Sequence, residues 1–82
     1  MWIRPEDHKV VGIALAAARQ GANLTQAELA KRLGKPQSFV SSYEAGQRRV
    51  DLLEIIRISE SLNADPVTLV REIIGAAKWK SP

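Results

Sequence analysis

The side chains best able to do chemistry gather in mid-chain, where one amide and three hydroxyls lie close together: Gln37, Ser38, Ser41 and Ser42. A serine becomes a nucleophile only beside a base that takes its proton, and neither Ser41 nor Ser42 has such a partner in the sequence. The one histidine, His8, has no companion ligands and cysteine is absent, so no metal site or disulfide is expected. We therefore expect no enzymatic activity and no cofactor, and hydrogen bonding as the chemistry of these side chains.

Charge is distributed unevenly along the chain, whose net charge is +3. From Arg19 to Arg49, six basic residues stand against two acidic ones, whereas residues 51–72 carry two basic and five acidic residues. A basic segment is the electrostatic pattern expected of a nucleic-acid-binding surface. Taken alone, such a pattern is more typical of charges scattered over a solvated surface, so the positions of the basic residues matter more than their number.

Length and composition favour one folded domain over residues 1–82, with short tails over 1–7 and 78–82. With 82 residues, 45% hydrophobic and 26% charged, the chain can build one modest core and is too short for a second, ligand-sensing domain. No apolar run approaches the roughly 20 residues that a membrane span needs, and the N-terminus does not resemble a signal peptide. We therefore expect a cytoplasmic protein without membrane contact.

Apolar periodicity and helix punctuation predict five helices and no strand. Two capping boxes mark helix starts, at Thr25 and at Asp51. In each, the side chain of this residue can accept the backbone amide of a glutamate three residues later, whose carboxylate can accept the amide of the first residue. The first predicted helix covers 9–20 and is ended by Gly21, the second runs from Thr25 to Gly34, and the third runs from Pro36 to near Gly46. The fourth runs from Asp51 to Asn63 and carries the apolar residues Leu52, Ile55, Ile56 and Leu62, and the fifth is capped by Asp65.

The second and third helices are separated by one short turn, at Gly34 and Lys35. A turn this short does not fold two helices comfortably into an antiparallel hairpin, so the helices should cross steeply, as in a helix-turn-helix over about 25–45. The small Ala30 suits a close helix approach, and Gly34 suits a positive φ. Val40 should point inward, with Tyr43 along the same face.

The run from Leu24 to Arg49, LTQAELAKRLGKPQSFVSSYEAGQRR, resembles the helix-turn-helix of the lambda repressor and Cro family, also called the XRE family. The resemblance spans about residues 9–74, and its signature residues are Gln26, Ala30, Gly34, Gln37, Val40, Glu44 and Gly46. It implies an all-α, five-helix, lambda-repressor-like DNA-binding domain. It also implies a sequence-specific transcriptional regulator whose partner is double-stranded DNA and whose recognition helix, about 36–45, enters the major groove.

With Val40 inward, the polar side chains Gln37, Ser38, Ser41 and Ser42 become the candidate base-reading surface. Glutamine can bridge N6 and N7 of adenine, and serine can bond to several bases. The alternative is an ordinary solvated polar face. Phe39 flanks this surface and either contacts a thymine methyl group or packs on the second helix.

Five residues are candidate phosphate contacts: Thr25, Gln26, Lys35, Arg48 and Arg49. Gln26 begins the second helix, where unpaired amides attract a phosphate, and the resemblance implies that it also buttresses Gln37. Arg48 and Arg49 follow the recognition helix in a loop and would fix its register without reading sequence. Lys35-Pro36 departs from the family, which more often has a serine or threonine cap there, so a phosphate-binding hydroxyl is missing.

Two further expectations concern pairing. The resemblance implies a partly buried ion pair between Arg19 and Glu44. Apolar residues of the last helix spread around more than one stripe, which favours a homodimer seam formed by Val67, Val70, Ile73, Ile74 and Ala77. Trp2 and Trp79 either cap that seam or belong to loose tails.

The leading hypothesis is a repressor acting as a homodimer on a near-palindromic operator, because one small domain reads too few base pairs for specificity. Related alternatives are the controller of a restriction-modification system and the antitoxin of a toxin–antitoxin pair. An alternative of another class is a protein-interaction module on the same fold.

Overall fold

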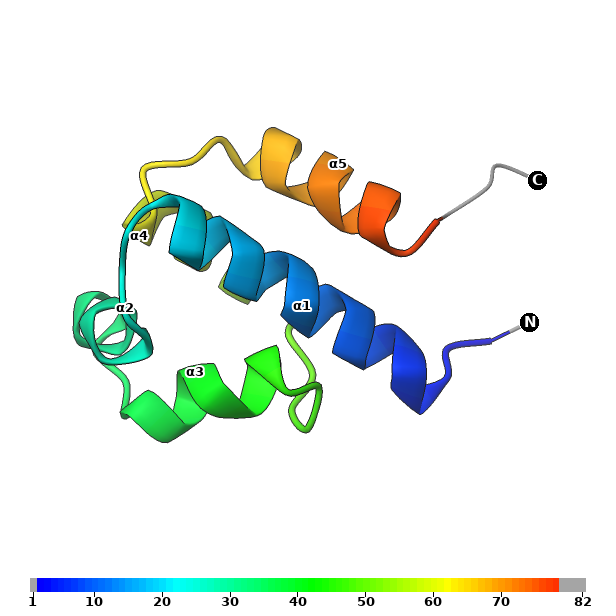
Figure 1. Cartoon of the computed structure of the whole chain (residues 1–82), viewed down its shortest axis with the longest axis horizontal. Coiled ribbons are helices and arrows are strands. Elements are labelled where there is room, and N and C mark those ends of the chain that lie inside the picture. Colours follow the sequence, from blue (N-terminus) through cyan, green and yellow to red (C-terminus); the bar gives the residue numbers. More distant parts are fainter. Residues whose placement is uncertain (1, 79–82) are drawn as a thin grey trace.

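The computed structural model describes residues 2–78, which form five helices and no strand (Figure 1). The helices are α1 (Pro5–Gly21), α2 (Gln26–Leu33), α3 (Gln37–Glu44), α4 (Leu52–Ser61) and α5 (Pro66–Ala76). The expected all-α, five-helix fold is confirmed. No helix within residues 2–78 is long and apolar enough to cross a membrane.

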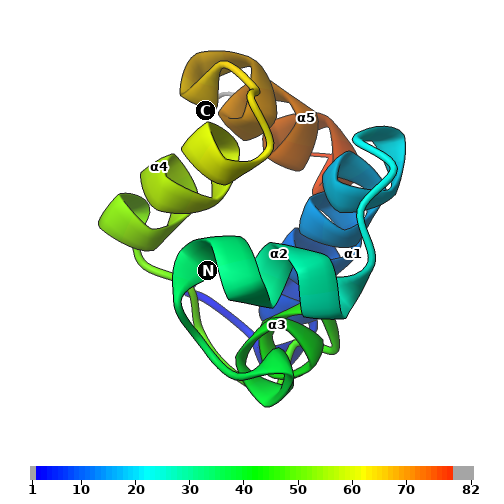
Figure 2. The same cartoon turned by 90° about the vertical axis from the view of Figure 1, so that its left-hand side faces the viewer.

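α1 forms the centre of the fold, with α5 along one side and α3 along the other (Figure 1). α2 packs on α3 and on α4, and α4 packs on α5, so the helices surround one core (Figure 2). Because every helix is amphipathic, each contributes an apolar stripe to that core. Its buried members are Leu15, Leu29, Ala30, Val40, Tyr43, Ile58, Leu62 and Leu69.

Helix starts and stops follow the sequence signals closely. The Thr25 hydroxyl accepts the Glu28 amide at 3.1 Å, and the Glu28 carboxylate accepts the Thr25 amide at 2.9 Å. Asp51 and Glu54 form the same reciprocal box at the start of α4. Gly34, at φ 68°, takes the left-handed conformation that ends α2.

Two helix starts differ from expectation, and one apolar residue of α4 lies at the surface. α1 begins at Pro5 because proline suits a first helical turn and the Asp7 carboxylate accepts the Arg4 amide at 2.8 Å, so residues 5–7 are not a tail. Pro36 precedes α3 as its extended N-cap residue, and the helix itself begins at Gln37. Leu52, an apolar residue at the start of α4, is 66% exposed because the inward stripe of that helix runs through Ile55, Ile58 and Leu62.

α1 and α3 approach each other more closely than any sequence signal indicated. Gly12 is buried on α1, and a Cβ added there would lie 2.4 Å from the carbonyl oxygens of both Tyr43 and Glu44. Gly46, which follows α3, makes a second close approach to α1. Its φ is 77°, and a Cβ added there would lie 2.6 Å from the Lys9 Cα. Two glycines therefore allow the C-terminal end of α3 to lie directly against α1.

Candidate nucleic-acid interface

α2 and α3 form the helix-turn-helix. In Figure 1 α2 is seen end-on while α3 runs across the view, so the two axes cross steeply. The turn closes where the Lys35 amide donates to the Ala30 carbonyl at 2.9 Å, and Ala30 itself is buried between the helices. Val40 and Tyr43 are fully buried, which leaves the opposite side of α3 at the surface.

The candidate base-reading residues lie on that outer side to different degrees. Gln37 and Ser38 are exposed at the start of α3, whereas Ser41 and Ser42 are half-buried. The Ser41 hydroxyl donates to the Ser38 carbonyl at 3.2 Å, within one turn of the helix. Of these four candidates, Gln37 and Ser38 are therefore the most accessible, and no side chain within residues 2–78 bonds to either of their side chains.

Glu44 joins three helices through a partly buried hydrogen-bond cluster. Its carboxylate accepts hydrogen bonds from Arg19 Nε at 2.8 Å and from Arg19 Nη2 at 3.1 Å. The Glu44 side chain is only 7% exposed, and that of Arg19 is 11% exposed. Arg19 Nη1 also donates to the Leu24 carbonyl at 2.7 Å. The hydrogen bonds to Glu44 raise the pKa of Arg19 above its ordinary value. This cluster holds α3 to α1 at the end that approaches Gly12.

The Gln26 side chain bonds to a different partner from the one that the resemblance implies. Its Nε2 donates to Glu44 Oε1 at 2.9 Å, so within residues 2–78 it buttresses the ion pair and not Gln37. The sequence shows only a polar residue at the first position of α2, which does not indicate a hydrogen-bond partner 18 residues away. The Gln26 backbone amide still begins α2, and its side chain retains a second N–H.

Phe39 is half-buried, and its ring packs against the core. Its ring meets the buried Tyr43 edge-on, with centroids 5.6 Å apart. Two cations lie near the ring: the Arg48 guanidinium carbon at 4.4 Å and Lys35 Nζ at 5.6 Å from its centroid. The Tyr43 hydroxyl has no hydrogen-bond partner within residues 2–78, and its burial raises the pKa of this phenol.

The remaining phosphate candidates differ in whether other residues of the protein already bind their hydrogen-bonding or charged groups. The Thr25 hydroxyl accepts the Glu28 amide and keeps its own proton to donate. Lys35 and Arg49 are exposed, and no carboxylate among residues 2–78 pairs with either. Arg48 instead bonds Glu54, with Nη2 2.7 Å from Oε2, and no sequence pattern pointed to this pair.

The expected seam residues on α5 divide between core and surface. Val70 and Ile73 are half-buried, and Ile73 packs against the core. Val67 and Ile74 are 57% and 44% exposed, and Ala77 is exposed just after the helix. Trp2 is 85% exposed, and Trp79 lies outside the described residues.

The sequence and the fold both match known regulators. A family model described as helix-turn-helix matches residues 15–69. An uncharacterized HTH-type transcriptional regulator of Sinorhizobium fredii, y4dJ, is 34% identical over 62 residues, which are 76% of this chain and 80% of that protein. Among solved structures, an XRE-family like protein from Pseudomonas syringae is 37% identical, with a TM-score of 0.74 and 85% of each chain covered.

A second solved structure is the restriction-modification controller protein C.AhdI from Aeromonas hydrophila. It is 32% identical, with a TM-score of 0.71, and the match covers 83% of this chain and 97% of that one. The chain therefore belongs to the lambda repressor and Cro-like (XRE) family of helix-turn-helix DNA-binding proteins. It is a transcriptional regulator of the XRE type, and the family's partner is DNA.

Proposed function

We propose that this regulator represses transcription by binding a near-palindromic operator as a homodimer. The observation that carries the proposal is a rigidly held α3 with accessible hydrogen-bonding side chains at its outer start. Glu44 ties that helix to α1 and α2, so its polar face is presented in one orientation. A helix of this kind fits the major groove, where its first turn reaches base edges.

We assign base contacts to Gln37, Ser38, Ser41 and Ser42, with Gln37 and Ser38 foremost because they are the most exposed. Phosphate contacts fall to four residues around them. The Thr25 hydroxyl and the amides of Gln26 lie at the start of α2, where the helix dipole also attracts an anion. Lys35 and Arg49 supply the exposed positive charge.

Selection of bound duplexes from a random DNA library tests this function directly. We expect enrichment of an inverted repeat with half-sites about 10 base pairs apart, which a dimer with one recognition helix per half-site requires. Enrichment of a single half-site would contradict the dimer but would still show sequence-specific binding. No retention at low salt would overturn DNA binding and leave the protein-interaction module. A reporter gene placed behind the selected sequence then shows whether binding represses transcription.

The salt dependence of binding identifies the phosphate contacts. We expect Arg49→Ala to reduce the slope of log affinity against log salt by about 0.9, because one neutralised phosphate is lost. The base preference should stay as in the wild type, since phosphate contacts carry no sequence information. The matched control is Arg57→Ala on α4, an exposed arginine outside both the helix-turn-helix and the proposed seam, which should leave the slope unchanged. Equal slopes for Arg49→Ala and the wild type would remove Arg49 from the interface.

We place the dimer seam on the exposed apolar residues of α5, Val67, Ile74 and Ala77, with Val70 and Ile73 beneath them. Ile74→Glu should convert the protein to a monomer in sedimentation, because the new charge would have to be buried at the seam. Leu53→Glu is the matched control, since Leu53 on α4 is 73% exposed and also apolar. A monomeric Leu53→Glu beside a dimeric Ile74→Glu would move the seam to α4.

The likeness to C.AhdI favours a second candidate within the same class, the controller of a restriction-modification system. Restriction and methyltransferase genes beside the coding region would support it. A toxin gene in that place would support the antitoxin alternative.

A further inference from the structure

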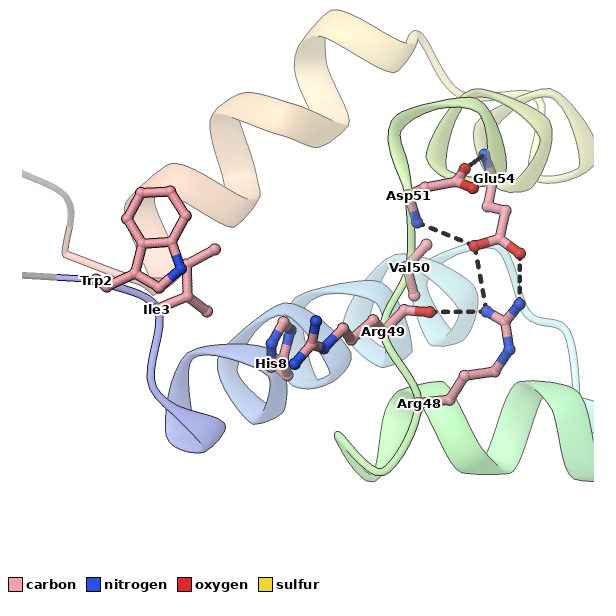
Figure 3. A pocket seen from close by; sticks show the side chains of 8 residues that line it. All are labelled: Trp2, Ile3, His8, Arg48, Arg49, Val50, Asp51 and Glu54. Carbon is pink, nitrogen blue, oxygen red and sulfur yellow. Dashed lines mark hydrogen bonds and ion pairs between the residues drawn. The ribbon is translucent and has the colours of Figure 1, made fainter.

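Arg48 bonds to α4 through both arms of its guanidinium, as Figure 3 shows. Nη2 donates to Glu54 Oε2 at 2.7 Å, and Nη1 donates to Glu54 Oε1 at 3.2 Å. Nη1 also donates to the Arg49 carbonyl at 2.8 Å. This two-pronged arrangement fixes the direction of the guanidinium as well as its place, which a single hydrogen bond does not.

The same guanidinium contacts α3 through Phe39. Its central carbon lies 4.4 Å from the ring centroid, within the range of a cation–π contact, and the ring in turn meets Tyr43 in the core. The Arg48 backbone is also tied to α3, because its amide donates to the Ser42 carbonyl at 3.3 Å. A continuous set of contacts therefore runs from the core through Phe39 and Arg48 to Glu54 on α4.

The positive charge of Arg48 is neutralised by the carboxylate of Glu54. Its hydrogen bonds with Glu54 raise the pKa of Arg48 and lower the pKa of Glu54, so both groups stay ionised as a neutral pair. A neutral pair offers little attraction to a phosphate. The neighbouring Arg49, with no carboxylate partner among residues 2–78, offers a full positive charge.

We propose that Arg48 is a positioning residue: held by Glu54 and stacked on Phe39, it fixes α3 relative to α4 and does not contact phosphate. α3 is then held on two flanks, by Glu44 to α1 and α2, and by Phe39 and Arg48 to α4. This inference rests on the proposed DNA binding and reassigns one residue that the sequence placed among the phosphate contacts.

Glu54→Gln separates the two roles by the sign of its effect. Glutamine keeps the capping box with Asp51, since its side-chain oxygen can still accept the Asp51 amide, but it loses the charge that holds Arg48. If Arg48 contacted phosphate, removing this negative charge would free it and strengthen binding. If Arg48 positions α3, binding to the selected operator weakens, by about tenfold when one base contact is misaligned.

The experiment measures the affinity of the full chain for the duplex recovered from the library and for a scrambled duplex of equal length. For Glu54→Gln we expect weaker binding to the selected duplex, unchanged binding to the scrambled one, and an unchanged salt slope. A merely structural loss would weaken both, and a melting curve shows that the variant is folded at the assay temperature. Affinity equal to or above the wild type for the selected duplex would overturn the proposal.

Arg48→Lys provides a second, independent variant. Lysine keeps the positive charge for a phosphate but loses the planar stack and the two parallel hydrogen bonds. We expect it to lose discrimination as Glu54→Gln does, whereas Arg57→Lys, at an exposed arginine of α4 outside the helix-turn-helix, should bind like the wild type. Discrimination retained in Arg48→Lys would overturn the positioning role. A wild-type chain that binds neither duplex would overturn the proposed function itself, a result visible before any variant is made.

Discussion

Gly12→Ala is expected to lower the melting temperature by about 10–25 °C and to abolish operator binding. The new Cβ would lie 2.4 Å from the carbonyl oxygens of Tyr43 and Glu44, far inside the distance at which non-bonded atoms pack. Both neighbours are backbone atoms, so no side chain can turn aside, and α1 must separate from α3. We expect a loss of about 3 kcal/mol or more in the free energy of unfolding. In a domain of this size such a loss lowers the melting temperature by about 10–25 °C.

Gly75→Ala is the matched control for that substitution. Gly75 lies near the end of α5, and a Cβ added there meets nothing within 4 Å. Alanine in a helix is favoured over glycine, so this variant should melt at or above the wild-type temperature, with a gain of up to about 1 kcal/mol. Thermal unfolding of both variants, followed by circular dichroism, decides the matter. A Gly12→Ala protein as stable as the wild type would contradict the close approach of α1 and α3.

Glu44→Ala is expected to destabilise the domain by about 3 kcal/mol, the low end for breaking a buried ion pair because Arg19 keeps some contact with solvent. The substitution removes the acceptor of three hydrogen bonds, two from Arg19 and one from Gln26. It leaves the Arg19 charge with only the Leu24 carbonyl among the described residues. Denaturant unfolding measures the loss, and an unchanged midpoint would show that the pair does not hold α3.

A surface pair offers the comparison. Arg57 and Glu60 lie one turn apart on α4, with Nη1 3.1 Å from Oε1, but their side chains are 77% and 55% exposed. Exposed pairs contribute little because water solvates both partners well, so Glu60→Ala should unfold close to the wild-type midpoint. The contrast between Glu44→Ala and Glu60→Ala therefore isolates the effect of burial. Similar losses in the two variants would mean that burial of the Glu44 cluster is unimportant.

Local features of the fold could be predicted from the sequence because their causes are local. The capping box at Thr25 and the left-handed residue at Gly34 each depend on neighbours within one helical turn. The inward face of α3 followed from placing Val40 in the core, and the structure buries Val40 and Tyr43 fully. Such signals predict the starts of α2, α4 and α5 and the end of α2, whereas α1 begins at Pro5, before the residue 9 expected from the sequence.

Contacts between distant segments could not be predicted in the same way. Gly12 looks like any small helix residue until α3 is seen to lie against it. The bond from Gln26 to Glu44, and the pair of Arg48 with Glu54 across a loop, depend on how helices are packed and not on spacing along one helix. The exposure of Leu52 at the first turn of α4 likewise depends on how the other helices pack around it.

The two-sided support of α3 has a consequence for how such regulators diverge. The residues that hold the helix, Glu44 on one flank and Phe39 on the other, are separate from the exposed Gln37 and Ser38. Substitutions at the exposed positions remove no contact that maintains the fold, so they carry little cost in stability. Descendants of one gene can therefore acquire new target sites by a few changes on this face, and a designer can retarget the protein by the same route.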